Sequence, residues 1–454
     1  MIAKRRRKAG DGAYPASLAQ RRIWEHCQGP NGPAGYILAT ARPVSGPIDL
    51  VALRASLDHI ARRHEMLRTT FEEHDGELVQ IVHEAAPLEL AFVDLGGAAD
   101  PAAAAQRRLR AAALEPFALE RGPLVRFSLV RLSEREHELQ QVSHHIISDA
   151  ASWSLLIEEL AAIYPALLRG DAPPLPGKLA PQPRDIAARE RRELRPGNPR
   201  FERSLAWWRK LAEAGESNPL PFLRPERDAG AGLRDGVIAW GLDAELVAGL
   251  EGLARRLGVS YFRLGLATFT ALLASESGEA EILVGTMIGR RDRETRALFG
   301  CFSHLMTLRL ALDPRLRFAE WAKLVATAVD EAKRHSALPF EEAATWLARE
   351  GRTLPSIRAV FQLRLPHSVR FDDIEIGSPR RSSDHYMQTG FELVVDRRVS
   401  ANDCAVLFDP RIYDPALVRA FVERYRALLG SICADADRSI GALTTGNAGE
   451  ASKR

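Results

Sequence analysis

Helical and strand patterns alternate along the whole chain, and this alternation is the strongest constraint on its fold. Asp49 precedes a stretch with apolar residues at helical spacing, which predicts a capped helix. The runs 124–132 and 137–145 are rich in strand-forming residues and joined by a short polar link, which predicts a hairpin. Asp243 and Ser260 open further helical patterns in the second half. The chain is therefore expected to be an α/β protein.

Length favours two lobes, because 454 residues exceed the roughly 100–200 residues that usually share one core. The segment 171–197 is rich in Pro and charge and has no apolar period in its first half, so we place the boundary near residue 180. The predicted layout is a disordered basic tail at 1–14, lobes at 15–180 and 181–440, and a flexible tail at 441–454.

Charge and apolar content exclude several classes of protein. The net charge is only +3, and Lys and Arg are dispersed among Asp and Glu, which argues against a nucleic-acid partner. The basic run Lys4–Lys8 is interpreted as a solvated tail. No apolar run approaches the roughly 18 residues of a membrane span, and no signal peptide follows Met1, so a cytoplasmic protein is expected. The dispersed cysteines predict neither disulfides nor a thiolate zinc site.

The segment 143–150 reads Ser-His-His-Ile-Ile-Ser-Asp-Ala and lies where the last strand of the hairpin gives way to a helix. Neighbouring side chains of a strand face opposite sides, so only one of His144 and His145 is expected to enter a cleft. A neutral imidazole can accept a proton from an attacking amine or hydroxyl, or donate a hydrogen bond to an oxyanion. Without further context, a structural histidine pair is an equally weighted interpretation.

Asp149 follows His145 by four residues, but the strand-to-helix change falls between them and no third ligand is evident, so no metal site is predicted. A carboxylate at a helix start usually caps backbone N–H groups or pairs with an arginine. Arg63 would suit such a buried carboxylate.

His144-His145-x-x-x-Asp149 resembles the HHxxxDG motif of condensation domains of non-ribosomal peptide synthetases. Residues 17–24 resemble the opening motif SxAQxRLW, and residues 63–71 match RHExLRTxF in full, which argues against an epimerization domain. Later segments resemble further family motifs in the family's order, and these are residues 285–290, 299–302, 335–341 and 355–362. Together the motifs cover roughly residues 15 to 430.

This resemblance implies two chloramphenicol-acetyltransferase-like lobes in a V-shaped pseudo-dimer, with the active site in a tunnel at their junction. It implies that His145 is catalytic, that His144 is structural, and that Asp149 pairs with Arg63, supported by Arg68. It also implies that Ser152, Gly300 and His304 are tunnel candidates.

The implied reaction joins an acyl or peptidyl thioester donor to the amine of an acceptor, both held on the 4'-phosphopantetheine arms of carrier proteins. No cofactor of its own and no metal is implied, and the chain is expected to be a monomer whose partners are the two carriers. His145 either removes the amine proton or positions the amine and stabilises the tetrahedral intermediate.

Several positions depart from the family pattern. Ala150 replaces the motif glycine, which matters only if the backbone there requires a positive φ, and His304 replaces the Asn of GxFVNT. These changes leave an ester-forming or acyl-CoA-dependent acyltransferase as an alternative, and an inactive module that only recruits partners as another.

Overall fold

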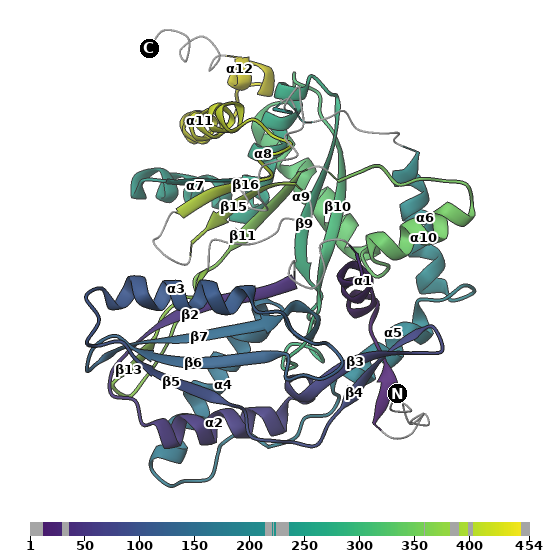
Figure 1. Cartoon of the computed structure of the whole chain (residues 1–454). Coiled ribbons are helices and arrows are strands. Elements are labelled where there is room, and N and C mark those ends of the chain that lie inside the picture. Colours follow the sequence, from purple (N-terminus) through teal and green to yellow (C-terminus); the bar gives the residue numbers. More distant parts are fainter. Residues whose placement is uncertain are drawn as a thin grey trace. The chain divides into compact units, whose positions relative to one another are not determined.

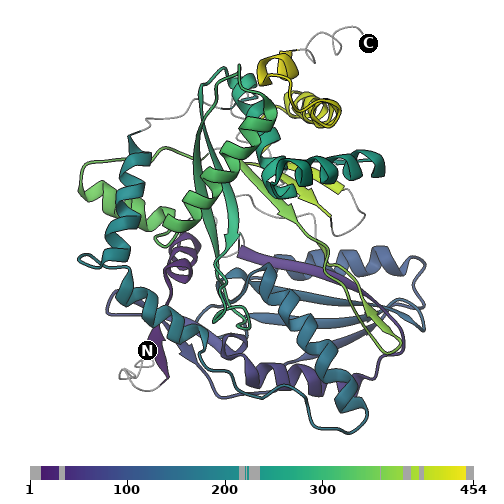
Figure 2. The ribbon, with the colours of Figure 1, turned by 180° about the vertical axis from the view of Figure 1, so that it is seen from behind.

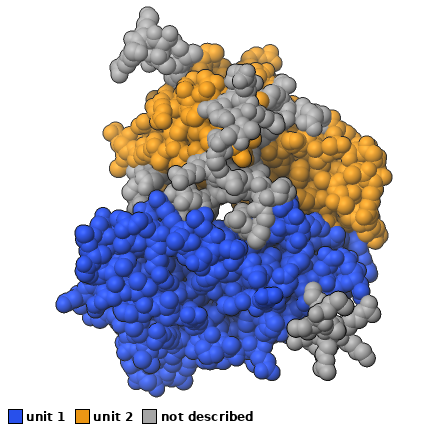
Figure 3. All heavy atoms as spheres, in the orientation of Figure 1, with its two compact units in different colours: residues 1–195, 289–304, 366–385 blue, residues 196–288, 305–365, 386–454 orange. Residues whose placement is uncertain are grey.

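The computed structural model describes residues 12–29, 36–213, 220, 222–223, 236–357, 359–381, 390–397 and 403–445. The chain divides into two compact units, coloured separately in Figure 3. The first comprises residues 1–195, 289–304 and 366–385, and the second comprises residues 196–288, 305–365 and 386–454. Two segments far along the chain therefore return to the first unit. The basic run Lys4–Lys8 of the predicted N-terminal tail lies outside the described residues, as does residue 446 onward.

The main sheet of the first unit has the strand order β12-β13-β2-β7-β6-β5, and β14 also pairs with β2. The pairs β2–β7 and β6–β7 are antiparallel, whereas β5 runs parallel to β6. The bounds are β2 (Ile37–Ser45), β5 (Leu90–Asp94), β6 (Val125–Arg131), β7 (Glu136–His144), β12 (Val369–Phe371), β13 (Ile374–Ile376) and β14 (Arg380–Arg381). A smaller sheet has the order β1-β4-β3, from β1 (Ala13–Pro15), β3 (Thr69–His74) and β4 (Glu77–Val82).

Helices cover both faces of the main sheet. On one face Gln140 of β7 donates a side-chain hydrogen bond of 2.9 Å to the carbonyl of Ala105 in α3 (Pro101–Leu114), the helix in front of the sheet in Figure 1. On the other face Trp153 of α4 (Ala150–Leu168) packs edge-on against Phe127 of β6, with ring centroids 5.9 Å apart. Seen from behind in Figure 2, α4 crosses the sheet. The remaining helices of this unit are α1 (Leu18–Cys27), α2 (Leu50–Arg63), η2 (Glu65–Arg68), η3 (His145–Ile147) and α5 (Pro183–Glu193).

The second unit is built on a sheet of order β10-β9-β11-β15-β16-β8. Its strands are β8 (Gly236–Gly241), β9 (Glu281–Gly289), β10 (Ser303–Ala311), β11 (Val360–Arg364), β15 (Phe391–Asp396) and β16 (Asp403–Phe408), the ends of β9 and β10 belonging to the first unit. Its helices are α6 (Pro199–Ala212), α7 (Ala244–Leu257), α8 (Tyr261–Ser277), α9 (Phe318–His335), α10 (Phe340–Arg349), α11 (Pro415–Ala434) and α12 (Ile440–Thr445). Each unit has its own apolar core.

The predicted α/β class is confirmed, and local signals placed most elements. Asp49 and Asp243 cap α2 and α7 as predicted, and Gly258 ends α7 with a left-handed φ of 69°. Residues 65–68 form the 3-10 helix η2, so β3 begins at Thr69.

The apolar helix α4 has the length and composition of a membrane span, with half of its most apolar window buried inside the structure. The adjoining helices α7 and α8 pass the same test together, but they are bent by 99° where they meet. The buried residues of α4 include Leu156, Ile157 and Leu160, which belong to the core of the first unit. This burial is typical of a core helix.

Candidate active site

The histidine pair lies at the junction of β7, η3 and α4. A side chain accepts a hydrogen bond from a backbone N–H at the start of η3 and again at the start of α4. His144 is the last residue of β7, and its Nδ1 accepts a 3.2 Å hydrogen bond from the backbone N–H of Ile146. The strand predicted to run through His145 ends one residue earlier, and His145 is the first residue of η3. Asp149 then caps α4 by accepting from the N–H of Ser152 at 2.8 Å. The turn that presents His145 is thus fixed on both sides.

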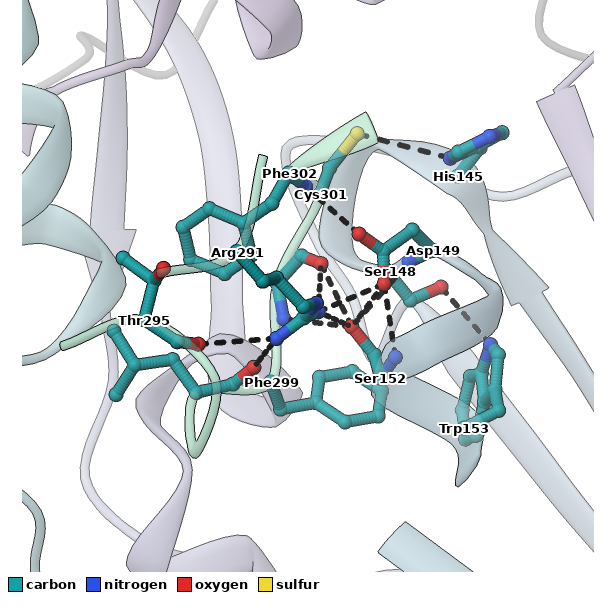
Figure 4. Close-up of polar contacts among 12 residues, drawn as sticks. His145, Ser148, Asp149, Ser152, Trp153, Arg291, Thr295, Phe299, Cys301 and Phe302 are labelled. Atoms are coloured by element: carbon teal, nitrogen blue, oxygen red, sulfur yellow. Dashed lines mark hydrogen bonds and ion pairs between the residues drawn. The ribbon is translucent and has the colours of Figure 1, made fainter. Parts of the chain in front are cut away.

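Asp149 is the centre of a buried polar cluster at the start of α4 (Figure 4). Its Oδ1 lies 2.8 Å from both the hydroxyl of Ser152 and the Nη2 of Arg291, and its Oδ2 accepts from the backbone N–H of Phe302 at 3.0 Å. The side chains of Asp149 and Arg291 are only 3% and 12% exposed. A buried charge needs such a partner and saturated hydrogen bonds, and Asp149 has both.

The same cluster holds the segment 291–302 against α4. Arg291 donates through Nη1 to the carbonyls of Thr295 and Leu298, at 3.1 and 2.5 Å. The Ser152 hydroxyl lies 2.7 Å from the carbonyl of Gly300 and accepts from its N–H at 3.0 Å. A Cβ at Gly300 would lie 2.8 Å from the ring of Phe302, so a larger residue at this position would have to displace that ring. The cluster therefore places the next residue, Cys301, beside His145.

The predicted ion pair between Arg63 and Asp149 is wrong. Arg63 donates through Nε to Glu159 at 2.8 Å, and His64 Nε2 lies 2.7 Å from the other oxygen of that carboxylate. Glu159 follows Asp149 by ten residues on the same helix, which separates them by about 15 Å along its axis. An Arg63 side chain that is hydrogen-bonded to Glu159 therefore cannot also reach Asp149.

Glu159 is nevertheless a charged, buried group. Burial alone would raise the pKa of its carboxyl, but hydrogen bonds from His64 and Arg63 outweigh burial and lower the pKa below its ordinary value. The backbone N–H of Phe299 also lies 3.4 Å from His64 Nδ1. This second cluster is structural, since the contacts of Glu159 with Arg63 and His64 join α2 to α4.

His145 has the surroundings of a neutral imidazole. Its ring is partly buried, and its Nδ1 lies 3.7 Å from the Sγ of Cys301. Burial lowers the pKa of His145, and the smaller attraction of Asp149 for the charged form does not reverse this. Burial also raises the pKa of Cys301 to about 12, so its thiol is protonated near neutral pH. Because Nδ1 faces the thiol, Nε2 is the ring nitrogen that does not face Cys301.

His144 is fully buried, and burial followed by the neighbouring His145 lowers its pKa to about 3. Since Nδ1 accepts from Ile146, the neutral ring carries its proton on Nε2, which lies 3.6 Å from the Sγ of Cys27. Both nitrogens are thus engaged inside the protein, as a structural histidine requires.

Other predicted site residues lie around this centre with separate contacts. Arg68 donates to the carbonyl of His83 and lies 3.9 Å from Glu65, away from Asp149. Ala150 begins α4 and is not among the described residues with positive φ, so replacing the motif glycine creates no backbone strain. His304 is buried in β10.

Sequence reasoning missed Arg291 and Cys301 as parts of this cluster. Gly289 and Arg290 match a family motif, but Arg290 lies 3.4 Å from Glu190, and the next arginine forms the ion pair with Asp149. The adjacent arginines Arg290 and Arg291 were the sequence signal for an ion pair with Asp149. Only the fold shows which of the two makes it.

Comparisons with known proteins agree with this architecture. The sequence profile of the family described as Condensation domain matches residues 11–453. The chain is 33% identical over 444 residues to a linear gramicidin synthase polypeptide of Brevibacillus parabrevis, covering 95% of this chain and 6% of that protein. It is 33% identical over 451 residues to phosphinothricin tripeptide synthetase PhsC of Streptomyces viridochromogenes, covering 96% of this chain and 41% of that protein. The chain thus spans less than half the length of either relative.

Among solved structures, the first condensation domain of the calcium-dependent antibiotic synthetase, in complex with a substrate analogue, superposes with a TM-score of 0.79. The match covers 94% of this chain and 98% of that one at 23% identity, which shows a shared fold.

Proposed function

The chain belongs to the condensation domain family, and on this premise we propose that it transfers an acyl or peptidyl group from a carrier-bound thioester to the amine of a carrier-bound acceptor. The observation that supports the proposal best is His145 itself. Its uncharged ring begins η3, with Nδ1 beside Cys301 and Nε2 left for reacting groups. Such a ring can act on a nucleophile near neutral pH.

In the proposed reaction the acceptor nitrogen attacks the thioester carbonyl carbon, and a C–N bond forms while the carbonyl π pair moves to oxygen. Collapse of the tetrahedral intermediate re-forms the carbonyl and breaks the C–S bond. The amine proton ultimately balances the charge of the departing pantetheine thiolate. His145 Nε2 either carries this proton or, in its other tautomer, donates to the oxyanion.

Holding two tethered reactants together supplies a further part of the rate, because the encounter becomes effectively intramolecular. The phosphopantetheine belongs to the carriers, so we propose no cofactor of the chain's own. We also propose a monomeric protein that works in the cytoplasm, with the donor and acceptor carriers as its partners.

Turnover with carrier-bound substrates tests the proposal. The His145→Ala variant is expected to lose product formation by about 100-fold or more, the usual contribution of a positioned acid or base, while its unfolding temperature stays near that of the wild type. His74→Ala is the matched control, because His74 belongs to the same unit and pairs with Glu72 in the smaller sheet. Equal turnover by His145→Ala and the wild type would remove the proposed role.

The donor form separates this proposal from the acyl-CoA alternative. The wild type is expected to turn over a carrier-bound donor much faster than the same acyl group on coenzyme A. Equal or faster use of the coenzyme A donor would instead favour a free-standing acyltransferase.

A further inference from the structure

A tyrosine next to the two histidines is tied to a histidine on another helix. Tyr36 lies immediately before β2, and its side chain is 5% exposed. Its hydroxyl lies 2.5 Å from Nδ1 of His26, which is in the last turn of α1 and is exposed. A buried phenol needs a hydrogen-bond partner, and His26 supplies it from the solvent side.

The ring of Tyr36 contacts both members of the histidine pair. It stacks on His144 at a centroid distance of 6.2 Å and an interplanar angle of 29°. It meets His145 edge-on at 6.4 Å and 65°. Cys27, the neighbour of His26, also lies against His144. The last turn of α1 and Tyr36 therefore form one wall around the two imidazoles.

Tyr36 contributes a hydrogen bond to this wall in addition to the packing of its ring. A phenylalanine at position 36 would fill the same space, but its ring could tilt without losing a hydrogen bond. With the hydroxyl held by His26 at 2.5 Å, tilting the tyrosine ring would break that bond. The orientation of the ring is thus coupled to α1, and the edge of the ring restricts how the imidazole of His145 can turn.

We propose that Tyr36 and His26 are positioning residues for His145, which they hold in the orientation that directs Nε2 to the reactants. The inference rests on the proposed acyl transfer, in which Tyr36 and His26 would affect the rate only through His145. His26 touches Tyr36, and Tyr36 touches the histidines, so the two are expected to act as one unit.

A double-mutant cycle tests this unit. Tyr36→Phe and His26→Leu are each expected to lower kcat about fivefold, the factor supplied by one hydrogen bond of ordinary net strength, with KM for both carriers unchanged. The double variant is expected to show the same fivefold loss and not the roughly 25-fold loss of independent sites. His26→Gln, which keeps an acceptor for the hydroxyl, is expected to restore most of the rate.

Tyr14→Phe is the matched control, because it removes a tyrosine hydroxyl that accepts from Arg184 at 2.8 Å in the same unit, apart from the histidine pair. It is expected to leave kcat unchanged. Wild-type kcat in both Tyr36→Phe and His26→Leu would overturn the inference, as would losses that multiply in the double variant or that appear in KM alone.

Failure of the proposed function is separable from failure of this inference. A wild-type protein that makes no product refutes the function, and the ring ¹⁵N resonances of His145 then serve as the readout. These resonances are expected to shift in Tyr36→Phe and in His26→Leu but not in Tyr14→Phe. Unchanged resonances in the first two variants would refute the positioning role. Because His26 is exposed, its variant keeps this readout available even if Tyr36→Phe does not fold.

Discussion

A double-mutant cycle of unfolding free energies can identify the ion-pair partner of Asp149, and the structure predicts that this partner is Arg291. Asp149 lies within hydrogen-bond distance of one guanidinium, one hydroxyl and two backbone N–H groups, and its side chain is 3% exposed. Removing either charge leaves the other buried without its partner, which costs about 3–5 kcal/mol. Asp149→Ala and Arg291→Ala are therefore each expected to lower the free energy of unfolding by that amount.

The double variant distinguishes the ion pair from two independent effects. Once Asp149 is gone, Arg291 has no carboxylate to lose, so the double variant is expected to be at least about 1 kcal/mol more stable than the sum of the single losses predicts. A cycle of Asp149 with Arg63 is expected to be additive within about 0.5 kcal/mol, because Arg63 pairs with Glu159.

Urea denaturation followed by tryptophan fluorescence measures these differences through the change in midpoint at constant slope. Arg309→Ala serves as the control, because its pair with Glu281 is 34% and 47% exposed and is expected to contribute less than about 1 kcal/mol. Coupling of Asp149 to Arg63, or additivity of Asp149 with Arg291, would refute the assignment.

Three further predictions concern the neighbouring buried groups. Because the pKa of His144 is lowered to about 3, its neutral form stabilises the fold above pH 6.5. This stability is lost progressively as pH falls toward 3, by up to about 1.4 kcal/mol per pH unit. The His144→Leu variant should show a flatter dependence of unfolding free energy on pH in acid denaturation. Cys301→Ser is expected to change kcat about fivefold, and more than Cys301→Ala, because a hydroxyl donates to His145 Nδ1 more strongly than a thiol and moves the ring proton to Nε2. A loss indicates that Nε2 removes the amine proton, a gain indicates that it donates to the oxyanion, and equal rates in steady-state assays would contradict the coupling. Arg63→Ala should cost about 3–5 kcal/mol in unfolding free energy by leaving Glu159 short of a donor, and a change below about 1 kcal/mol would contradict the buried pair.

Local signals in the sequence predicted what depends on neighbouring residues. The cap at Asp149 and the hairpin before it follow from spacing within a few residues, and both are present. The partner of Asp149 lies 142 residues away in the sequence, in a segment that joins the first unit only through the fold. No periodicity encodes that contact, and two arginines, Arg63 and Arg291, have the same chemistry. For the same reason the sequence did not predict the contacts of Cys301 and Tyr36, which reach the histidines from other parts of the first unit.

Burial explains how an acidic group can lie near His145 without charging it. Burial lowers the pKa of His145, whereas the charge of Asp149 acts in the opposite direction. Arg291 compensates that charge at 2.8 Å, and two backbone N–H groups donate to the same carboxylate. The carboxylate can then cap α4 and hold the segment that carries Cys301, while the imidazole remains neutral. The structural charge and the neutral imidazole are thus kept apart within one turn of chain, as the proposed role of His145 near neutral pH requires.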